Sequence, residues 1–181
     1  MGEILKKEFY NRNTIDVAKS LLGCRLFRKI NDKILGGIIV ETEAYTQNDP
    51  ACHAFKGKTP RAATLFKQPG IAYVYLIYGM YYCFNTITEP ENTAGAVLIR
   101  ALEPIPPLNN TNGPGKLCRE LKITKELNEA KLTSQKSGLW IEKGEKIPEN
   151  NIVSTTRIGI KVATDLPWRF YIKNNPYISK K

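Results

Sequence analysis

The stretch Ile71-Ala-Tyr-Val-Tyr-Leu-Ile-Tyr-Gly-Met-Tyr-Tyr-Cys-Phe-Asn85 decides the fold, because it has the pattern of a β-hairpin. Strand-forming Val, Ile, Tyr and Phe flank the pair Tyr78-Gly79, and glycine supplies the positive φ that a tight turn needs. With a period of two, Tyr73 and Tyr75 share one face of the first strand. We therefore predict a hairpin with Tyr78 and Gly79 at its tip.

The aromatic side chain at this tip allows two interpretations. Tyr78 could fold back onto its own domain, as most large apolar side chains do. Alternatively, it could act as a wedge that enters between stacked bases, as in proteins that bind the minor groove. The hairpin alone does not distinguish the two.

Length and composition indicate one folded domain, residues 1–181, with a polyanionic partner. Of the 181 residues, 42% are hydrophobic, which is typical of a globular chain with its own core. The 27 basic residues exceed the 17 acidic ones, and the net charge of +10 favours nucleic acid as the partner. The lysines are spread along the chain, so the fold has to assemble any basic face.

The sequence carries no signal for a membrane, a secretory pathway or a metal. No apolar run could span a bilayer, and the N-terminal residues lack a secretory pattern, so we expect a monomeric cytoplasmic protein that associates with the nucleoid when bound to DNA. Four cysteines lie far apart and His53 is the single histidine, which makes a zinc site a poor interpretation. We expect no cofactor.

The remaining pattern predicts an α+β fold, a single mixed domain with a curved antiparallel β-sheet core, flanking short helices and a protruding hairpin. Gly36-Gly37 lies inside one predicted strand and indicates a bulge or a close backbone approach. Thr14 is the predicted cap of the first helix, and the last residues, 179–181, are expected to fray. The predicted helices are 15–22, 60–66, 116–121 and 124–132, and the further strands are 24–30, 34–42, 96–102, 139–141, 152–160 and 168–172.

Two carboxylates are the candidate catalytic groups, because the common catalytic and nucleotide-binding motifs are absent. The sequence has no P-loop, G-x-G-x-x-G, H-E-x-x-H or G-x-S-x-G pattern, so nucleotide hydrolysis, dinucleotide redox chemistry and serine hydrolysis have no support. Glu41 and Glu43 are two residues apart on a predicted strand and share one face. Glu43, at the strand end, could act as a general base on water, or it could be an ordinary solvated glutamate.

Arg100 lies inside the apolar run Val97–Leu102. A guanidinium there either points to the solvent side of the strand or meets an anion, such as a carboxylate or a phosphate. A further set of side chains is suited to a planar heterocycle, because aromatic rings stack on a base while His and Asn read its edge. This set is Tyr45, His53, Tyr75 and Asn85, although each tyrosine taken singly is more often part of a core or a rim.

Together, these segments resemble the alkyladenine (3-methyladenine) DNA glycosylases of the mammalian type, which bacteria also contain. The matching segments follow the family order over nearly the whole chain. They are Val40–Tyr45, Ala51–Ala54, Thr59–Arg61, Lys67–Gly70, Tyr73–Tyr81, Leu98–Pro104, Gly113–Cys118 and Trp168–Tyr171. The connection between Glu103 and Gly113 departs from the family, because mammalian members carry a longer basic segment there.

The resemblance implies an enzyme that flips a damaged purine out of duplex DNA and hydrolyses its N-glycosidic bond without a metal. Glu43 would be the general base, and Arg100 would hold the attacking water and the DNA backbone. Tyr78 would fill the gap left by the flipped base. Tyr45, His53 and Tyr75 would contact the base, and Asn85 would crowd the 2-amino group of guanine.

Two alternatives remain open at this stage. One is a non-catalytic nucleic-acid-binding module that keeps the basic face and the hairpin. The other is a metal-dependent nuclease that uses Glu41, Glu43 and Asp49.

Overall fold

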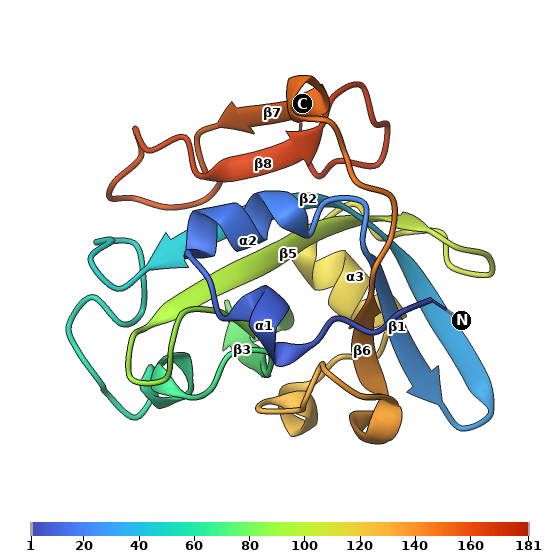
Figure 1. Ribbon diagram of the computed structural model, residues 1–181, viewed down its shortest axis with the longest axis horizontal. Helices are drawn as coiled ribbons and strands as arrows, with labels where there is room; N and C mark the ends of the chain where they lie inside the picture. Colours follow the sequence, from blue (N-terminus) through green and yellow to red (C-terminus); the bar gives the residue numbers. More distant parts are fainter. Residues whose placement is uncertain (1, 181) are drawn as a thin grey trace.

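A strongly curled antiparallel sheet forms the body of the protein in the computed structural model, which describes residues 2–180 (Figure 1). Within these residues the sheet has eight strands, with the order β3-β4-β5-β2-β1-β6 and with β8 and β7 attached beside β2. The strands are β1 (Arg25–Ile30), β2 (Lys33–Thr46), β3 (Ala72–Ile77), β4 (Tyr81–Ile87), β5 (Gly95–Pro104), β6 (Leu139–Glu142), β7 (Ile152–Thr155) and β8 (Arg169–Ile172). The predicted α+β class with a curved antiparallel sheet is confirmed.

Strand β2 is the longest and connects the parts of the sheet. Its first half pairs with β1, most of its length pairs with β5, and residues 41–43 also pair with β8. It runs to Thr46 rather than ending at residue 42, because β5 and β8 supply pairing partners beyond the predicted end. Glu43 therefore lies inside a strand and not at its end.

The ladder between β2 and β5 is irregular at one place. The register passes from Ile39↔Leu102 to Glu41↔Ala101 and then to Thr42↔Ile99, so Arg100 has no residue directly opposite it. Such an irregularity bends a strand and turns a side chain in a new direction. Here it allows Arg100 to approach two acidic residues of β2.

The predicted irregularity at Gly36-Gly37 is a close approach and not a bulge. Gly36 pairs regularly with Phe27, and a Cβ on Gly36 would lie 2.4 Å from the Phe27 ring atom Cδ1. A Cβ on Gly37 would lie 2.7 Å from the carbonyl oxygen of Glu103. The missing side chains let the neighbouring strands and rings pack closely.

Short helices flank the sheet. Helix α2 lays Val17 and Ala18 on the core, and its cap is Asn13, not Thr14. The Asn13 side chain accepts hydrogen bonds from the backbone of the first turn, whereas the Thr14 hydroxyl is buried against Thr88. The helices are α1 (Lys7–Tyr10), α2 (Thr14–Ser20), α3 (Pro114–Glu120) and the 3₁₀ turns η1 (Ala63–Phe66), η2 (Lys125–Leu127), η3 (Gln135–Ser137) and η4 (Glu149–Asn151). In the described range, 2–180, no helix is long and apolar enough to cross a membrane.

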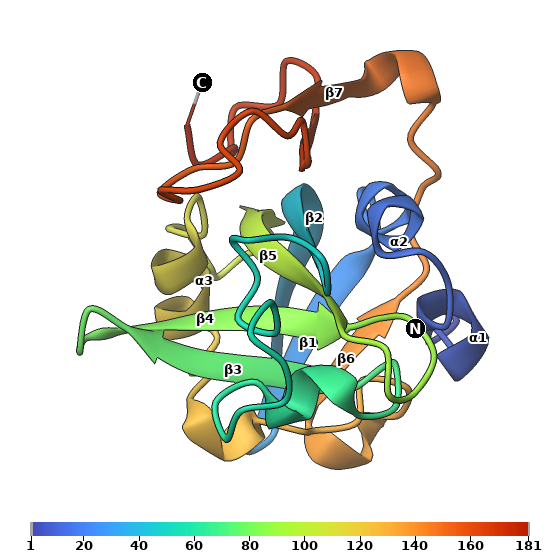
Figure 2. The same ribbon diagram turned by 90° about the vertical axis from the view of Figure 1, so that its left-hand side faces the viewer.

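The β3–β4 hairpin forms as predicted and projects from the body of the protein (Figure 2). The strands meet at the pair Ile77↔Tyr81, and both Tyr78 (φ 54°) and Gly79 (φ 70°) take positive φ angles in the turn. The Tyr78 side chain does not fold back onto the domain, because it is 77% exposed.

The C-terminal segment packs on the sheet instead of fraying. Strands β7 and β8 form a layer beside β2 and α2 (Figure 1), and the chain then turns back toward the centre of β2. The backbone N–H of Ser179 donates to Glu41, and the carbonyl oxygen of Lys180 accepts from Arg169. The prediction of fraying is thus wrong for these two residues, and Lys181 lies outside the described part of the chain, as does Met1.

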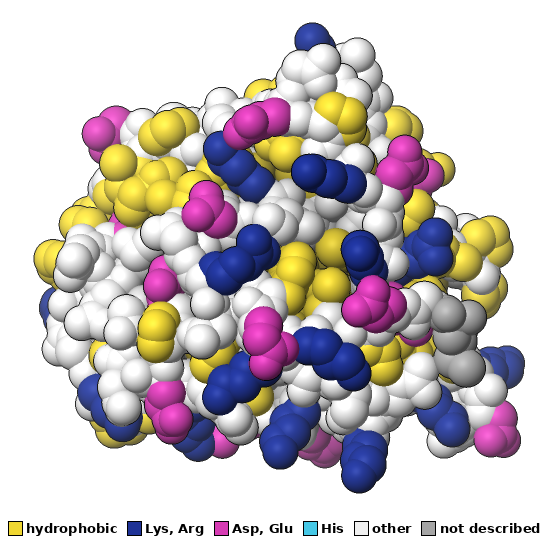
Figure 3. Space-filling view, viewed as in Figure 1, with side chains coloured by type: hydrophobic (Ala, Val, Ile, Leu, Met, Phe, Trp, Pro, Cys, Tyr) yellow, Lys and Arg dark blue, Asp and Glu magenta, His cyan; other side chains and the backbone are white. Residues whose placement is uncertain are grey.

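Basic side chains are numerous on the face that carries α1 and α2, but acidic ones are interspersed with them (Figure 3). The hairpin projects from the opposite side of the molecule. The face that carries α1 and α2 is therefore a mixed charged surface rather than a single basic patch.

Candidate active site

A cavity of about 620 Å³ lies at the base of the β3–β4 hairpin. Its walls come from β2, β3, β4 and β5, from the segment 51–53, from the start of α3 and from residues 158–160. Aromatic and aliphatic side chains dominate the walls, and a cavity of this size can hold a nucleobase. Among the residues in its walls are Tyr45, His53, Tyr73, Tyr75, Tyr78, Asn85, Leu98, Arg100, Lys116, Arg119 and Ile158.

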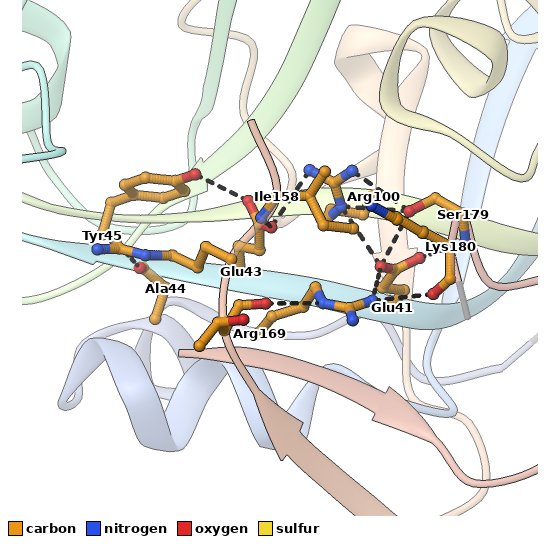
Figure 4. A network of polar contacts seen from close by, with 11 residues as sticks. Glu41, Glu43, Ala44, Tyr45, Arg100, Ile158, Arg169, Ser179 and Lys180 are labelled. Atoms are coloured by element: carbon orange, nitrogen blue, oxygen red, sulfur yellow. Dashed lines mark hydrogen bonds and ion pairs between the residues drawn. The ribbon is translucent and has the colours of Figure 1, made fainter. Parts of the chain in front are cut away.

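Glu43 is fully buried directly behind this wall. Its Oε1 accepts the backbone N–H of Ile158 (2.8 Å) and lies 3.2 Å from Arg100 Nη1. Its Oε2 accepts the Tyr45 hydroxyl (2.8 Å) (Figure 4). Glu43 is thus buried, with two hydrogen-bond donors and the Arg100 guanidinium as partners, so the interpretation as a solvated surface glutamate is wrong.

Arg100 joins the two glutamates of β2. Its side chain is buried, and Nε lies 3.4 Å from Glu41 Oε1 while Nη1 contacts Glu43 (Figure 4). Nε and Nη2 also donate to the Ser179 hydroxyl. Of the two sequence interpretations, Arg100 therefore meets anions and does not point to the solvent side.

Glu41 is held by a different set of partners. Arg169 Nη1 donates to Oε1 at 2.9 Å, and the backbone N–H of Ser179 donates to Oε2 at 2.5 Å. Arg169 in turn donates to the carbonyl oxygen of Thr156. Glu41 is buried, and its contacts connect Arg100, Arg169 and the C-terminal segment.

A second buried ion pair, Asp49–Arg157, lies behind Tyr45. The guanidinium contacts both carboxylate oxygens of Asp49, with Nη2 at 2.9 Å from Oδ1, and it stacks on the Tyr45 ring at 4.6 Å. Burial and the adjacent Glu43 raise the pKa of Tyr45 above its usual value. The Tyr45 hydroxyl therefore stays protonated and continues to donate to Glu43.

His53 is fixed in one tautomer by its neighbours. The Tyr73 hydroxyl donates to the carbonyl oxygen of Arg61 (3.2 Å), so Nδ1 of His53 is the donor in the 2.9 Å bond to the same hydroxyl. Burial, assisted by the Arg61 charge, lowers the pKa of His53 to about 4. The ring is neutral at physiological pH and packs edge-to-face on Tyr75 at 4.8 Å.

Asn85 and Tyr75 lie on adjacent hairpin strands. Asn85 is buried, and its Nδ2 donates to the carbonyl oxygen of Tyr73 (3.1 Å), which orients the amide. Tyr75 is half-buried, and burial together with Cys83 raises the pKa of its hydroxyl. Tyr78 lies at the cavity mouth, where the exposed tip of the hairpin meets the wall.

The structure thus brings all seven sequence-predicted residues to one place. Six of them line the cavity and Glu43 lies behind the wall; the six are Tyr45, His53, Tyr75, Tyr78, Asn85 and Arg100. Sequence reasoning missed Arg157, whose side chain is buried by contacts distant in the chain and leaves no local pattern. It also missed Ile158, which contributes a backbone N–H that any residue except proline would supply.

The carboxylates of the nuclease alternative are not arranged as a metal site. Glu41, Glu43 and Asp49 each pair with an arginine. Within residues 2–180, no group of three or more His, Cys, Asp and Glu side chains could hold a metal ion.

Comparison with known proteins places the chain in one family. Residues 8–176 match the model of the methylpurine-DNA glycosylase family, and the chain belongs to that family. It is therefore a DNA glycosylase, a hydrolase that acts on N-glycosyl bonds.

Individual relatives support the assignment over 90–100% of their own length. The chain is 51% identical to a protein of Carboxydothermus hydrogenoformans named "Putative 3-methyladenine DNA glycosylase", over 98% of this chain and 100% of that one. Proteins with the same name from Clostridium botulinum (46% identical, 98% and 100% covered) and Herpetosiphon aurantiacus (41% identical, 99% and 90% covered) are also similar.

Proposed function

We propose that this enzyme flips an alkylated or deaminated purine, of the 3-methyladenine or hypoxanthine type, out of duplex DNA and hydrolyses its N-glycosidic bond with a water that Glu43 activates. One observation carries the proposal. A buried carboxylate, paired with Arg100 and hydrogen-bonded to the N–H of Ile158, lies directly behind the wall of an aromatic cavity large enough for a base.

The water would bind beside Oε2 of Glu43. A carboxylate oxygen has two lone pairs, and Oε2 accepts a single hydrogen bond from the Tyr45 hydroxyl among the described residues. In the reaction, Glu43 takes a proton from the water, whose oxygen forms a bond to C1′ as the bond to the base breaks. The electron pair leaves with the base, and an abasic sugar with a C1′ hydroxyl remains.

The cavity walls suit a damaged base for two reasons. Alkylation at a ring nitrogen makes adenine cationic, and the faces of Tyr45 and Tyr75 attract a cation more than neutral adenine. His53 is neutral above pH 4, so it does not repel that charge. Asn85, oriented by its bond to β3, would crowd the 2-amino group of guanine.

The hairpin would compensate for the flipped base. Flipping costs a few kcal/mol, and an aromatic side chain inserted into the duplex restores part of the lost stacking. Tyr78 is 77% exposed at the tip of a projecting hairpin and borders the cavity, so it can enter the gap while the base enters the cavity.

The test is single-turnover release of hypoxanthine and of 3-methyladenine from duplex DNA in the presence of EDTA, comparing wild type with Glu43→Gln. We expect wild type to release at least one base, and the variant to bind the same DNA while excision falls by about 100-fold or more. Excision by Glu43→Gln at the wild-type rate would refute the role of Glu43. DNA binding without release by wild type would favour the binding module. In a parallel reaction with Mg²⁺, strand cleavage that EDTA abolishes would favour the nuclease.

A further inference from the structure

The Asp49–Arg157 pair has no part in the proposed chemistry, yet it is the most completely buried ion pair in residues 2–180. Both side chains have no exposed surface, and the guanidinium contacts both oxygens of the carboxylate. Removing two charges from water is costly, and replacing such a pair by apolar side chains is often neutral or stabilising. Stability alone therefore gives little reason for this pair, and its neighbours indicate another role.

Arg157 holds both ends of the loop that closes one side of the cavity. Its Nη1 donates to the carbonyl oxygen of Ala44 at 2.9 Å, and its Nη2 donates to that of Ala163 at 3.4 Å. The loop 157–163 is thereby tied to β2 at its start and to itself at its end. Residues 158–160 of this loop line the cavity.

The same loop supplies one of the donors to Glu43. Ile158, the residue after Arg157, gives its backbone N–H to Glu43 Oε1 at 2.8 Å (Figure 4). Because the Arg157 side chain fixes the backbone one residue earlier, it determines where this N–H points. A displacement of about 1 Å at a reacting group can cost about 100-fold in rate.

The guanidinium also supports the other donor to Glu43. It lies between the rings of Tyr45, at 4.6 Å, and Trp168, at 5.3 Å, in cation–π geometry. Tyr45 donates to Glu43 Oε2 and lines the cavity with the rest of its ring. Arg157 thus packs against the ring of Tyr45, and the hydroxyl of the same tyrosine donates to Glu43 Oε2.

Asp49 pairs with Arg157 and connects it to the opposite wall. Burial alone would lower the pKa of Arg157, but hydrogen bonds and charge from Asp49 raise it instead. The Asp49 side chain also accepts a hydrogen bond at Oδ1 from the backbone N–H of Ala51. The backbone carbonyl oxygen of Asp49 accepts one from the N–H of Cys52. Ala51 and Cys52 begin the turn that carries His53. One ion pair therefore links the loop 157–163, Tyr45 and the His53 turn.

We propose that Arg157, oriented by Asp49, is a positioning residue that aims Glu43 at the attacking water through the Ile158 N–H and the Tyr45 hydroxyl. The inference rests on the proposed role of Glu43. It assigns the pair to the chemical step rather than to DNA binding, because neither side chain reaches the surface.

The first test compares Asp49→Asn with wild type and with Glu142→Gln. Glu142 is a matched control, because it is also a buried acid, with its oxygens bonded to Trp140 and Gly2, but it lies on β6 away from the cavity. We expect Asp49→Asn to slow single-turnover excision of hypoxanthine by about 10- to 100-fold. Its dissociation constant for DNA that carries a stable abasic analogue should change by less than about twofold, because the pair does not reach the surface. Glu142→Gln should lose thermal stability but keep its rate.

The second test separates positioning from folding. If Asp49 acts through Glu43, adding Asp49→Asn to Glu43→Gln should not slow excision of the labile 3-methyladenine further, whereas independent effects would multiply. Arg157→Lys keeps the positive charge, but a lysine ammonium cannot bond Asp49, Ala44 and Ala163 at the same time. We expect the same loss of rate in this variant. It replaces Asp49→Asn in the test if Asp49→Asn does not fold.

Three outcomes overturn the inference: a wild-type rate in Asp49→Asn, rate losses that multiply in the double variant, or an equal loss in Glu142→Gln. Full activity of Glu43→Gln would instead overturn the proposed function, so the two failures are distinguishable.

Discussion

Replacing Arg100 by lysine tests the centre of the charge network. The guanidinium contacts Glu41 through Nε and Glu43 through Nη1, and one lysine ammonium cannot take both positions. If Arg100 is lost, Glu41 keeps Arg169 and Ser179 as partners, whereas Glu43 keeps two neutral donors, Tyr45 and Ile158. One lost charge-assisted hydrogen bond corresponds to about 1.5–3 kcal/mol of the free energy of unfolding.

For a chain of this size, that loss corresponds to a decrease in Tm of about 3–12 °C. Arg100→Met is the reference, because it leaves both carboxylates without this partner and should cost about 3–5 kcal/mol. Catalysis should suffer at least as much in Arg100→Lys, because removing one preorganised donor from a reacting centre costs about 100- to 1000-fold in rate.

The assays are urea and thermal unfolding, followed by single-turnover excision at saturating enzyme. Arg100→Lys should be folded at 25 °C, bind lesion DNA and excise slowly. A fall in Tm as large as that of Arg100→Met combined with a normal rate would show that Arg100 serves the fold alone and has no role in the reaction.

Two further predictions concern the hairpin tip and the histidine. Tyr78→Ala should leave Tm unchanged, since the side chain is 77% exposed. It should weaken binding to lesion-containing duplex DNA by about 5- to 150-fold, because about 1–3 kcal/mol of stacking is lost. An equal loss of affinity for single-stranded DNA in a binding titration would indicate a folding role instead. Burial lowers the pKa of His53 from its usual 6.5 to about 4. The unfolded chain therefore binds this proton more tightly than the folded protein. His53 thus makes the free energy of unfolding fall as pH drops from about 6.5 to 4. Urea unfolding across this range should show a weaker pH dependence in His53→Gln, and an unchanged slope would contradict the low pKa.

Local chemistry explains what sequence predicted well. The hairpin is specified by strand-forming residues around Tyr78-Gly79, so its position and its turn follow from neighbours in the chain. The grouping of the site residues followed from the family resemblance, which carries information about the fold that no single motif contains. Charge counting predicted a polyanionic partner, and membership of a DNA glycosylase family gives DNA as that partner.

Contacts between distant segments explain what sequence did not predict. Glu43 is a typical surface residue by type, and its burial comes from β8, the loop 157–163 and Arg100, which are far from it in the chain. Ser179 has no local reason to be ordered, but Glu41 provides an acceptor for its backbone. Arg157 lies in a region predicted as strand, whereas β7 ends at Thr155 and the chain then curls around the guanidinium.

The course of β2 has a consequence for how the protein fluctuates. Glu43 lies on the segment that pairs with β5 and β8 at the same time, so the amides around it can open to solvent only when the body of the sheet unfolds. Hydrogen exchange there should report the global free energy of unfolding. Beyond the ladder pair Ile77↔Tyr81, the hairpin tip has a backbone hydrogen bond of 3.2 Å from the Met80 N–H to the Ile77 carbonyl oxygen, and its amides should exchange much faster. The molecule therefore combines a proposed general base, Glu43, in the part of the sheet that opens last with a hairpin tip of low local stability.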